Sequence, residues 1–172
     1  MNLVVDANVF KGFYQETVLE MGPDKLEITG SPIGIFESDD KKIYVDDSKH
    51  IENEWRNVVD SEWFNAWYAV QIESLGIVET AIDNYQELIR ALNKIGFPVG
   101  GDKWYIRTAK SVKENGLSIT LITEDLDFYD PTKKMAKGAA RLRILNSKSA
   151  VVRKYLAKKE DINISCVKEF LP

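Results

Sequence analysis

Short apolar runs alternate with helix-spaced segments along this sequence, and no other feature restricts its fold so strongly. Apolar, β-branched runs at residues 3–7, 43–47 and 119–123, and a shorter one at the start of 162–171, predict strands. The segments between them repeat apolar residues at helical spacing. This order predicts an α/β fold, with a mainly parallel central sheet covered by helices on both faces, an α/β/α sandwich.

The connecting segments refine this prediction. Helices are expected over 9–21, from 48 to 70, over 79–95, over 102–116 and through most of 131–159. Residues 25–38 alternate around a Gly-Ser-Pro turn and predict an extra β-hairpin. With 172 residues, no repeat and no linker, the chain is expected to form a single domain over 1–172.

Composition excludes several chemistries. The only His is His50 and the only Cys is Cys166, so no intrachain disulfide can form and a Cys/His zinc site lacks ligands. Neither residue lies in a nucleophile-like context, which argues against a His-dependent triad. An enzyme of this composition would depend on carboxylates, amines or hydroxyls.

The single thiol also bears on location. It fits a reducing compartment, and the N-terminus lacks the basic region of a signal peptide, so a cytoplasmic protein is expected. The apolar, aromatic stretch at 63–72 is too short to span a membrane.

Acidic residues stand where expected strands end or where the following helices begin. The five are Asp6, Glu54, Asp102, Asp125 and Asp127. Because the carboxyl ends of parallel strands meet at one edge of a sheet, we expect these acids to converge. Carboxylates can share a small volume only if protons or cations neutralise them, and oxygen-only ligation favours Mg²⁺ or Mn²⁺. Such ions support phosphodiester hydrolysis without histidine.

Each acid also has an ordinary structural interpretation. Asp6 and Asp102 are placed to cap helices, and Glu54 is placed to be a solvated helix residue. The acids after residue 123 are placed to be turn residues. The joint pattern favours the metal site, because the acids recur at the same end of successive strands.

Four segments resemble the motifs of PIN-domain proteins, and the likeness covers most of the chain. LVVDANVF is similar to the family's opening strand and first aspartate, Asp6, although Ala7 stands where the family often has Thr. IYVDDSKHIENEW resembles the second motif, which assigns Glu54 rather than Glu52. GGDKWYIRTA resembles the third, which begins with Asp102.

The fourth segment, LITEDLDF, is the most specific match, since the family's strand ends Thr-x-Asp-x-Asp-Phe. It assigns Thr123, Asp125 and Asp127.

This resemblance implies a Mg²⁺- or Mn²⁺-dependent nuclease, most often acting on RNA. It implies metal ligation by Asp6, Glu54, Asp102 and Asp125, a further ligand or water contact from Asp127, and support from Asn8 and Thr123. Many relatives are toxins of toxin–antitoxin pairs and many are homodimers, so an RNA substrate, a small antitoxin partner and a homodimer are expected. Segments 22–42 and 55–99 are longer than in the compact toxins.

Two other functions are compatible with parts of the pattern. A non-catalytic PIN-like module that binds RNA or a protein partner would have weak metal affinity and no turnover, and the complete acidic set argues against it. A Mg²⁺-dependent phosphatase commonly has a second aspartate two residues after the nucleophilic one, where this chain has Asn8.

Charge is distributed unevenly. The formal net charge is −4, yet residues 131–159 hold ten Lys or Arg and no Asp or Glu. The segment could contact phosphates or be a solvated face. The candidate RNA contacts are Lys133, Lys134, Lys137, Arg141 and Arg143.

An aromatic group lies in the 55–68 stretch, with Trp55, Trp63, Trp67 and Tyr68. Such side chains can stack on bases. An aromatic stripe at helical spacing is more often part of a core or a dimer interface.

Overall fold

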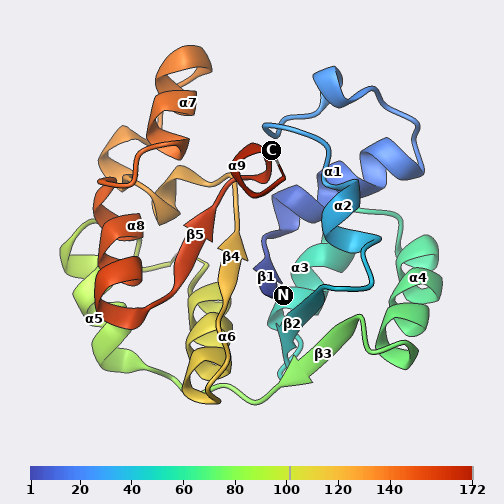
Figure 1. The fold of residues 1–172 in the computed structure, drawn as a ribbon, viewed down its shortest axis with the longest axis horizontal. Helices are drawn as coiled ribbons and strands as arrows, with labels where there is room; N and C mark the ends of the chain where they lie inside the picture. The colour runs from blue at the N-terminus through green and yellow to red at the C-terminus, as the bar shows by residue number, and fades with distance from the viewer. Residues whose placement is uncertain (101, 172) are drawn as a thin grey trace.

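A five-stranded parallel sheet forms the centre of the computed structural model, which describes residues 1–100 and 102–171 (Figure 1). The strand order is β3-β2-β1-β4-β5, and every neighbouring pair is parallel. Helices cover both faces, which confirms the α/β/α sandwich. The strands are β1 (Asn2–Val5), β2 (Lys42–Asp46), β3 (Ile77–Thr80), β4 (Thr120–Ile122) and β5 (Asn163–Ser165).

Nine α-helices accompany these strands in the described part of the chain. They are α1 (Ala7–Thr17), α2 (Ile33–Phe36), α3 (His50–Asn57), α4 (Ser61–Glu73), α5 (Gln86–Lys94), α6 (Lys103–Glu114), α7 (Gly138–Leu145), α8 (Val151–Tyr155) and α9 (Val167–Phe170). Three 3₁₀ turns, η1 (Pro23–Lys25), η2 (Leu126–Phe128) and η3 (Pro131–Lys133), and a π turn, η4 (Leu156–Glu160), complete the chain.

The central strands are apolar because they are buried on both faces. Leu3, Val4 and Val5 of β1 are fully buried, as a strand in the middle of a parallel sheet requires. Helix α6 packs against β1, β2, β3 and β4. The start of α6 is therefore fixed relative to the middle of the sheet.

The order of the strands places a switch point beside β1. The chain runs outward from β1 to β2 and β3, then returns to the other side of β1 to form β4 and β5. β1 and β4 pair from Leu3–Thr120 to Val5–Ile122, and both end at the same level. Ligands of open α/β sheets bind beyond the strand ends at such a reversal. Asp6 and Thr123 stand at this point.

The aromatic stretch at 55–68 contributes to the core. The ring of Phe10 on α1 stacks on fully buried Trp55, with centroids 4.5 Å apart, and also contacts Trp63 and Trp67. The core interpretation of this stretch is therefore confirmed. Half-buried Trp63 and Trp67 also line a cavity of about 840 Å³ beside the start of β2, away from the ends of the strands.

The predicted hairpin at residues 25–38 is wrong. This segment is described throughout and contains no strand; instead it holds a loop and α2. Its backbone hydrogen bonds are local, such as that from Ile35 N–H to the Pro32 carbonyl, 2.9 Å. Ile35 and Phe36 bury their side chains in the core, and this burial favours a helical turn over an exposed hairpin arm.

Two helix predictions need adjustment. The segment 79–95 is helical only in α5, because residues 77–80 pair with β2 as the edge strand β3. The helix expected from 48 to 70 is two helices, since the Asp60 side chain accepts a hydrogen bond from Trp63 N–H and starts α4. The helices at 102–116 and in the basic segment are confirmed.

No helix in the described ranges has the combined length and hydropathy that crossing a membrane requires.

Candidate active site

Asp6 lies at the centre of the strand-end edge. Its backbone N–H continues the β1–β4 ladder by donating to the Ile122 carbonyl, 2.9 Å. The side chain is 2% exposed, accepts a 2.7 Å hydrogen bond from Thr123 Oγ1 and caps α1 by accepting from Asn8 N–H. Burial raises the pKa of Asp6 to about 7, with smaller contributions from the charges of Asp125 and Asp102. Asp6 therefore both caps α1 and belongs to the acidic group.

Thr123 links Asp6 to the acids after β4. While it donates to Asp6, its oxygen accepts from the Asp125 backbone N–H at 3.1 Å. Asp125 in turn caps η2 by accepting from Asp127 N–H at 2.9 Å. Burial raises the pKa of the Asp125 carboxyl. The turn interpretation of these residues is correct for their backbone contacts, and the same turn holds their carboxylates at the edge.

Glu54 joins the group through Tyr105, a residue that the sequence reasoning missed. The Tyr105 hydroxyl donates to Glu54 Oε2 at 2.6 Å and accepts from the Ala7 backbone N–H at 3.1 Å. Tyr105 is fully buried, and its pKa is raised well above the ordinary value by burial and by the charges of Asp6 and Glu54. The sequence held one signal for this residue: Tyr105 follows Asp102 by three positions and so lies on the same helix face.

The competitor Glu52 lies elsewhere. Its carboxylate forms ion pairs with Arg56 and Lys49, at 2.9 and 3.2 Å. Glu52 is therefore held by cations, whereas Glu54 is held by the Tyr105 hydroxyl.

Asp102 precedes α6 and makes no capping hydrogen bond with its side chain. Its pKa is raised to about 6, mainly by burial and to a smaller extent by the charges of Glu54, Asp125 and Asp127. Together with the influence of Asp125 and Asp102 on Asp6, this couples all five predicted acids electrostatically. The five acids therefore lie close enough to influence one another's pKa values.

Only one of the two carboxylate oxygens of Asp127 has a partner among the described residues. Its Oδ2 lies 2.9 Å from Lys134 Nζ, while its buried Oδ1 has no hydrogen-bond partner among the described residues. The side chain of Asp127 is 8% exposed. An unsatisfied buried carboxylate oxygen requires an explanation, and a missing cation is one.

The predicted RNA contacts divide into separate groups. Lys134 contacts Asp127, and half-buried Arg141 donates to the Glu124 backbone carbonyl next to Asp125. Lys133 and Arg143 instead line a second cavity, of about 410 Å³. Lys137 is exposed where α7 begins. Asn8, the predicted supporting residue, is exposed and lines a small cavity with Arg141.

Other acids near the edge have structural roles. Asp46, fully buried at the end of β2, accepts from the His50 and Ile51 backbone N–H groups and so starts α3, the helix of Glu54. The His50 ring stacks on Trp104, with centroids 3.5 Å apart, and joins the starts of α3 and α6. Glu124, next to Asp125, also has a structural role. Its carboxylate accepts hydrogen bonds from the Thr29 hydroxyl and from Val167 N–H, and so connects distant segments to the end of β4.

The donor set fits Mg²⁺ or Mn²⁺ in chemical kind, since every candidate ligand atom is a carboxylate oxygen. The unpartnered Oδ1 of Asp127 is consistent with a missing ligand bond. Within residues 1–100 and 102–171, however, no group of three or more His, Cys, Asp or Glu side chains is arranged to hold a metal ion. The acids are coupled in charge but do not form a closed coordination shell.

Comparison with family models, with curated proteins and with solved structures finds no match to this chain.

Proposed function

We propose that the protein is a metal-dependent nuclease that hydrolyses RNA phosphodiester bonds at the strand-end edge of its sheet. The observation that carries this proposal is the burial of Asp6, whose pKa is raised to about 7 by that burial and, to a smaller extent, by the charges of Asp125 and Asp102. None of the ion pairs in the described residues involves Asp6. A buried group of acids is costly unless protons or cations neutralise it, and a divalent cation would allow all of the carboxylates to ionise together.

The residues have distinct roles in this proposal. Asp6, Glu54, Asp102 and Asp125 would hold Mg²⁺ or Mn²⁺, which would activate water and offset the charge that develops on the phosphate. Thr123 orients the Asp6 carboxylate and Tyr105 orients Glu54. Closing this set around an ion requires side-chain movement.

Support for RNA as the substrate comes from the PIN-domain resemblance and from the cations beside the acids, Lys134 and Arg141. An antitoxin partner, a homodimer and a cytoplasmic location stay predictions.

The test is cleavage of a mixed-sequence single-stranded RNA by the wild type, Asp6→Asn and Asp24→Asn, with Mn²⁺ and with a chelator. Asp24 is an exposed acid of η1 and serves as the control. We expect the wild type and Asp24→Asn to cleave only with Mn²⁺, and Asp6→Asn to be at least 100-fold slower, the order of loss expected for a group that stabilises the transition state.

The second candidate is a non-catalytic module that binds RNA or a protein, and the absence of a metal-ready group among the described side chains favours it. A folded wild type that binds RNA but neither binds Mn²⁺ nor cleaves would contradict the nuclease and support the module. Hydrolysis of a chromogenic phosphomonoester would instead indicate a phosphatase.

A further inference from the structure

We propose that Lys134 is an exchangeable counter-ion of the acidic edge: its ammonium neutralises Asp127 without metal, and metal binding releases it to contact a substrate phosphate. This inference rests on the proposed function and assigns Lys134 a role that a surface phosphate contact alone does not include.

The geometry of Asp127 is the first argument. The carboxylate is buried, yet its hydrogen bonding is incomplete: Lys134 Nζ lies 2.9 Å from Oδ2, and Oδ1 has no partner among the described residues. A buried carboxylate in this state is stabilised by any cation that can reach it. Lys134 is the cation that reaches it here.

The reach of the Lys134 charge is the second argument. Besides its contact with Asp127, this ammonium lies at the turn that also carries Asp125, because Asp127 N–H donates to Asp125 Oδ1 at 2.9 Å. A divalent ion placed among these carboxylates would repel the ammonium and satisfy the same oxygens.

The freedom of Lys134 to move is the third argument. Its side chain is 59% exposed, and it extends from the turn between η3 and α7 on a flexible stem. Arg141, by contrast, is half-buried and held by the Glu124 carbonyl. Once a divalent ion neutralises Asp127, Lys134 can leave it and contact a phosphate that binds beside the acids.

Removal of the Lys134 charge should strengthen metal binding, since the metal would no longer displace a bound cation. The test is calorimetric titration of the full chain with Mn²⁺, comparing the wild type with Lys134→Gln, Lys134→Arg and Lys133→Gln. Lys133→Gln removes the same charge from the neighbouring residue, whose ion pair is with Asp130, 3.7 Å away. Lys134→Arg keeps the charge.

We expect Lys134→Gln to bind Mn²⁺ about two- to fivefold more tightly than the wild type, the range for a partly exposed ion pair. Lys133→Gln and Lys134→Arg should stay closer to the wild type. At saturating Mn²⁺, Lys134→Gln should raise KM for RNA more than Lys133→Gln does, because the released ammonium is missing.

Three outcomes would overturn the inference, and they differ in meaning. Equal Mn²⁺ affinities for Lys134→Gln and Lys133→Gln, in a wild type that binds Mn²⁺, would exclude the counter-ion role and leave the nuclease proposal intact. Tighter Mn²⁺ binding without a larger KM would exclude the exchange onto phosphate. No Mn²⁺ binding by any of the four proteins would contradict the metal site, and with it both proposals.

Discussion

Asp6 combines burial, hydrogen bonding and missing charge compensation in one residue. Thr123 and Asn8 donate hydrogen bonds to it, which lower its pKa, but burial outweighs them and leaves the pKa at about 7. The unfolded value is near 3.8. Between these two values the folded protein binds more protons than the unfolded chain, so metal-free stability falls as pH rises from about 4 to about 7.

The fall of metal-free stability with rising pH should depend on Asp6. Asp6→Asn removes the titrating group with little change in shape, so the metal-free variant should lose less stability than the wild type between pH 4.5 and 7.5. We expect a difference of roughly 2–4 kcal/mol over this interval, from about 1.4 kcal/mol per unit of pKa shift. The measurement is urea unfolding in a chelator. Asp24→Asn should follow the wild type, and parallel curves for wild type and Asp6→Asn would contradict the prediction.

At the same scale, the sequence located the acids but not all of their partners. Asp6, Asp125 and Asp127 follow strands, and the edge on which they converge follows from the parallel sheet alone. Tyr105 was missed because the sequence shows a helical tyrosine mainly as an apolar residue. The contacts of its hydroxyl depend on Glu54 and Ala7, which lie 51 and 98 positions earlier in the chain. Such contacts follow from tertiary packing.

At the scale of the elements, Tyr105 connects three of them. From the first turn of α6 its hydroxyl reaches Glu54 on α3 and the Ala7 N–H at the start of α1. Trp55 adds a second link, because its indole N–H donates to the Val5 carbonyl at the end of β1, 3.0 Å. The relative positions of Asp6 and Glu54 therefore depend on buried hydrogen bonds between elements.

Tyr105→Phe should weaken this arrangement. The variant leaves the Ala7 N–H and Glu54 Oε2 without these partners, so we expect a loss of about 1–3 kcal/mol in the free energy of unfolding, together with weaker Mn²⁺ binding. Tyr85→Phe is the control, because Tyr85 bonds Ser111 and Glu114 near the other end of α6. Urea unfolding and calorimetry measure both effects. Equal Mn²⁺ affinities for the two variants would show that Tyr105 does not position Glu54.

Prediction of the elements succeeded where length and periodicity agreed. The strands β1, β2 and β4 and the helix α6 were found because their patterns are clear. β3 was missed because four residues, IVET, are too few to distinguish an edge strand from the start of a helix, and pairing with β2 decides the matter. The hairpin prediction was wrong for a related reason. Residues of this segment pack into the core or bond to distant side chains such as Glu124, and do not pair with one another as two strands.

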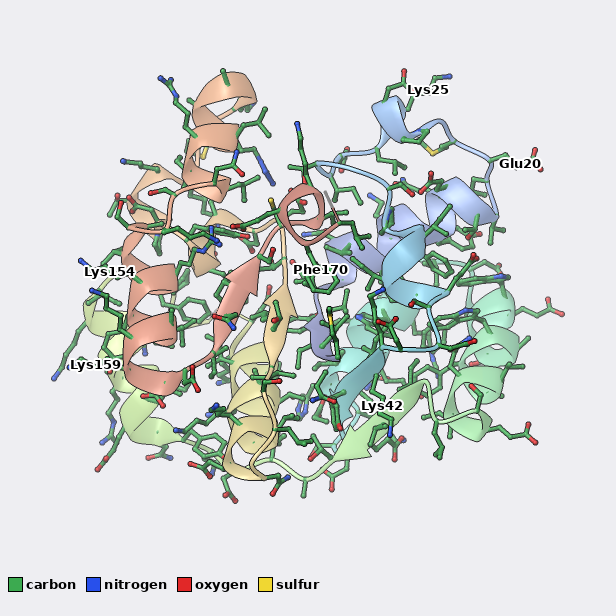
Figure 2. The ribbon with its side chains drawn as sticks, in the orientation of Figure 1. Glu20, Lys25, Lys42, Lys154, Lys159 and Phe170 are labelled. Atoms are coloured by element: carbon green, nitrogen blue, oxygen red, sulfur yellow. The ribbon has the colours of Figure 1, made fainter. Side chains whose placement is uncertain are left out.

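At the scale of the whole molecule, the basic segment does not form one surface. Helix α7 stands at the top left of Figure 1, across the view from the segment that follows α1, and Lys134 lies in the turn before α7. Lys154 and Lys159, on α8 and η4, point outward from the side of the molecule (Figure 2). The ten basic residues therefore lie on different parts of the molecule, although the sequence presents them as one run.

The last prediction compares the two parts of this segment. Lys137→Gln with Arg143→Gln removes two exposed charges around α7, and Lys154→Gln with Lys159→Gln removes two from the α8 side, so both variants change the net charge equally. If RNA passes over α7 to reach the acids, the first pair should weaken binding and lower the slope of log affinity against log salt by about 0.7 per lost phosphate contact, the single-strand value. The second pair should change the slope little.

Binding is measured by fluorescence anisotropy at several salt concentrations, in a chelator to prevent cleavage. Equal losses for the two pairs would mean that only net charge attracts RNA, and a larger loss for the α8 pair would place the RNA path on the other side of the molecule.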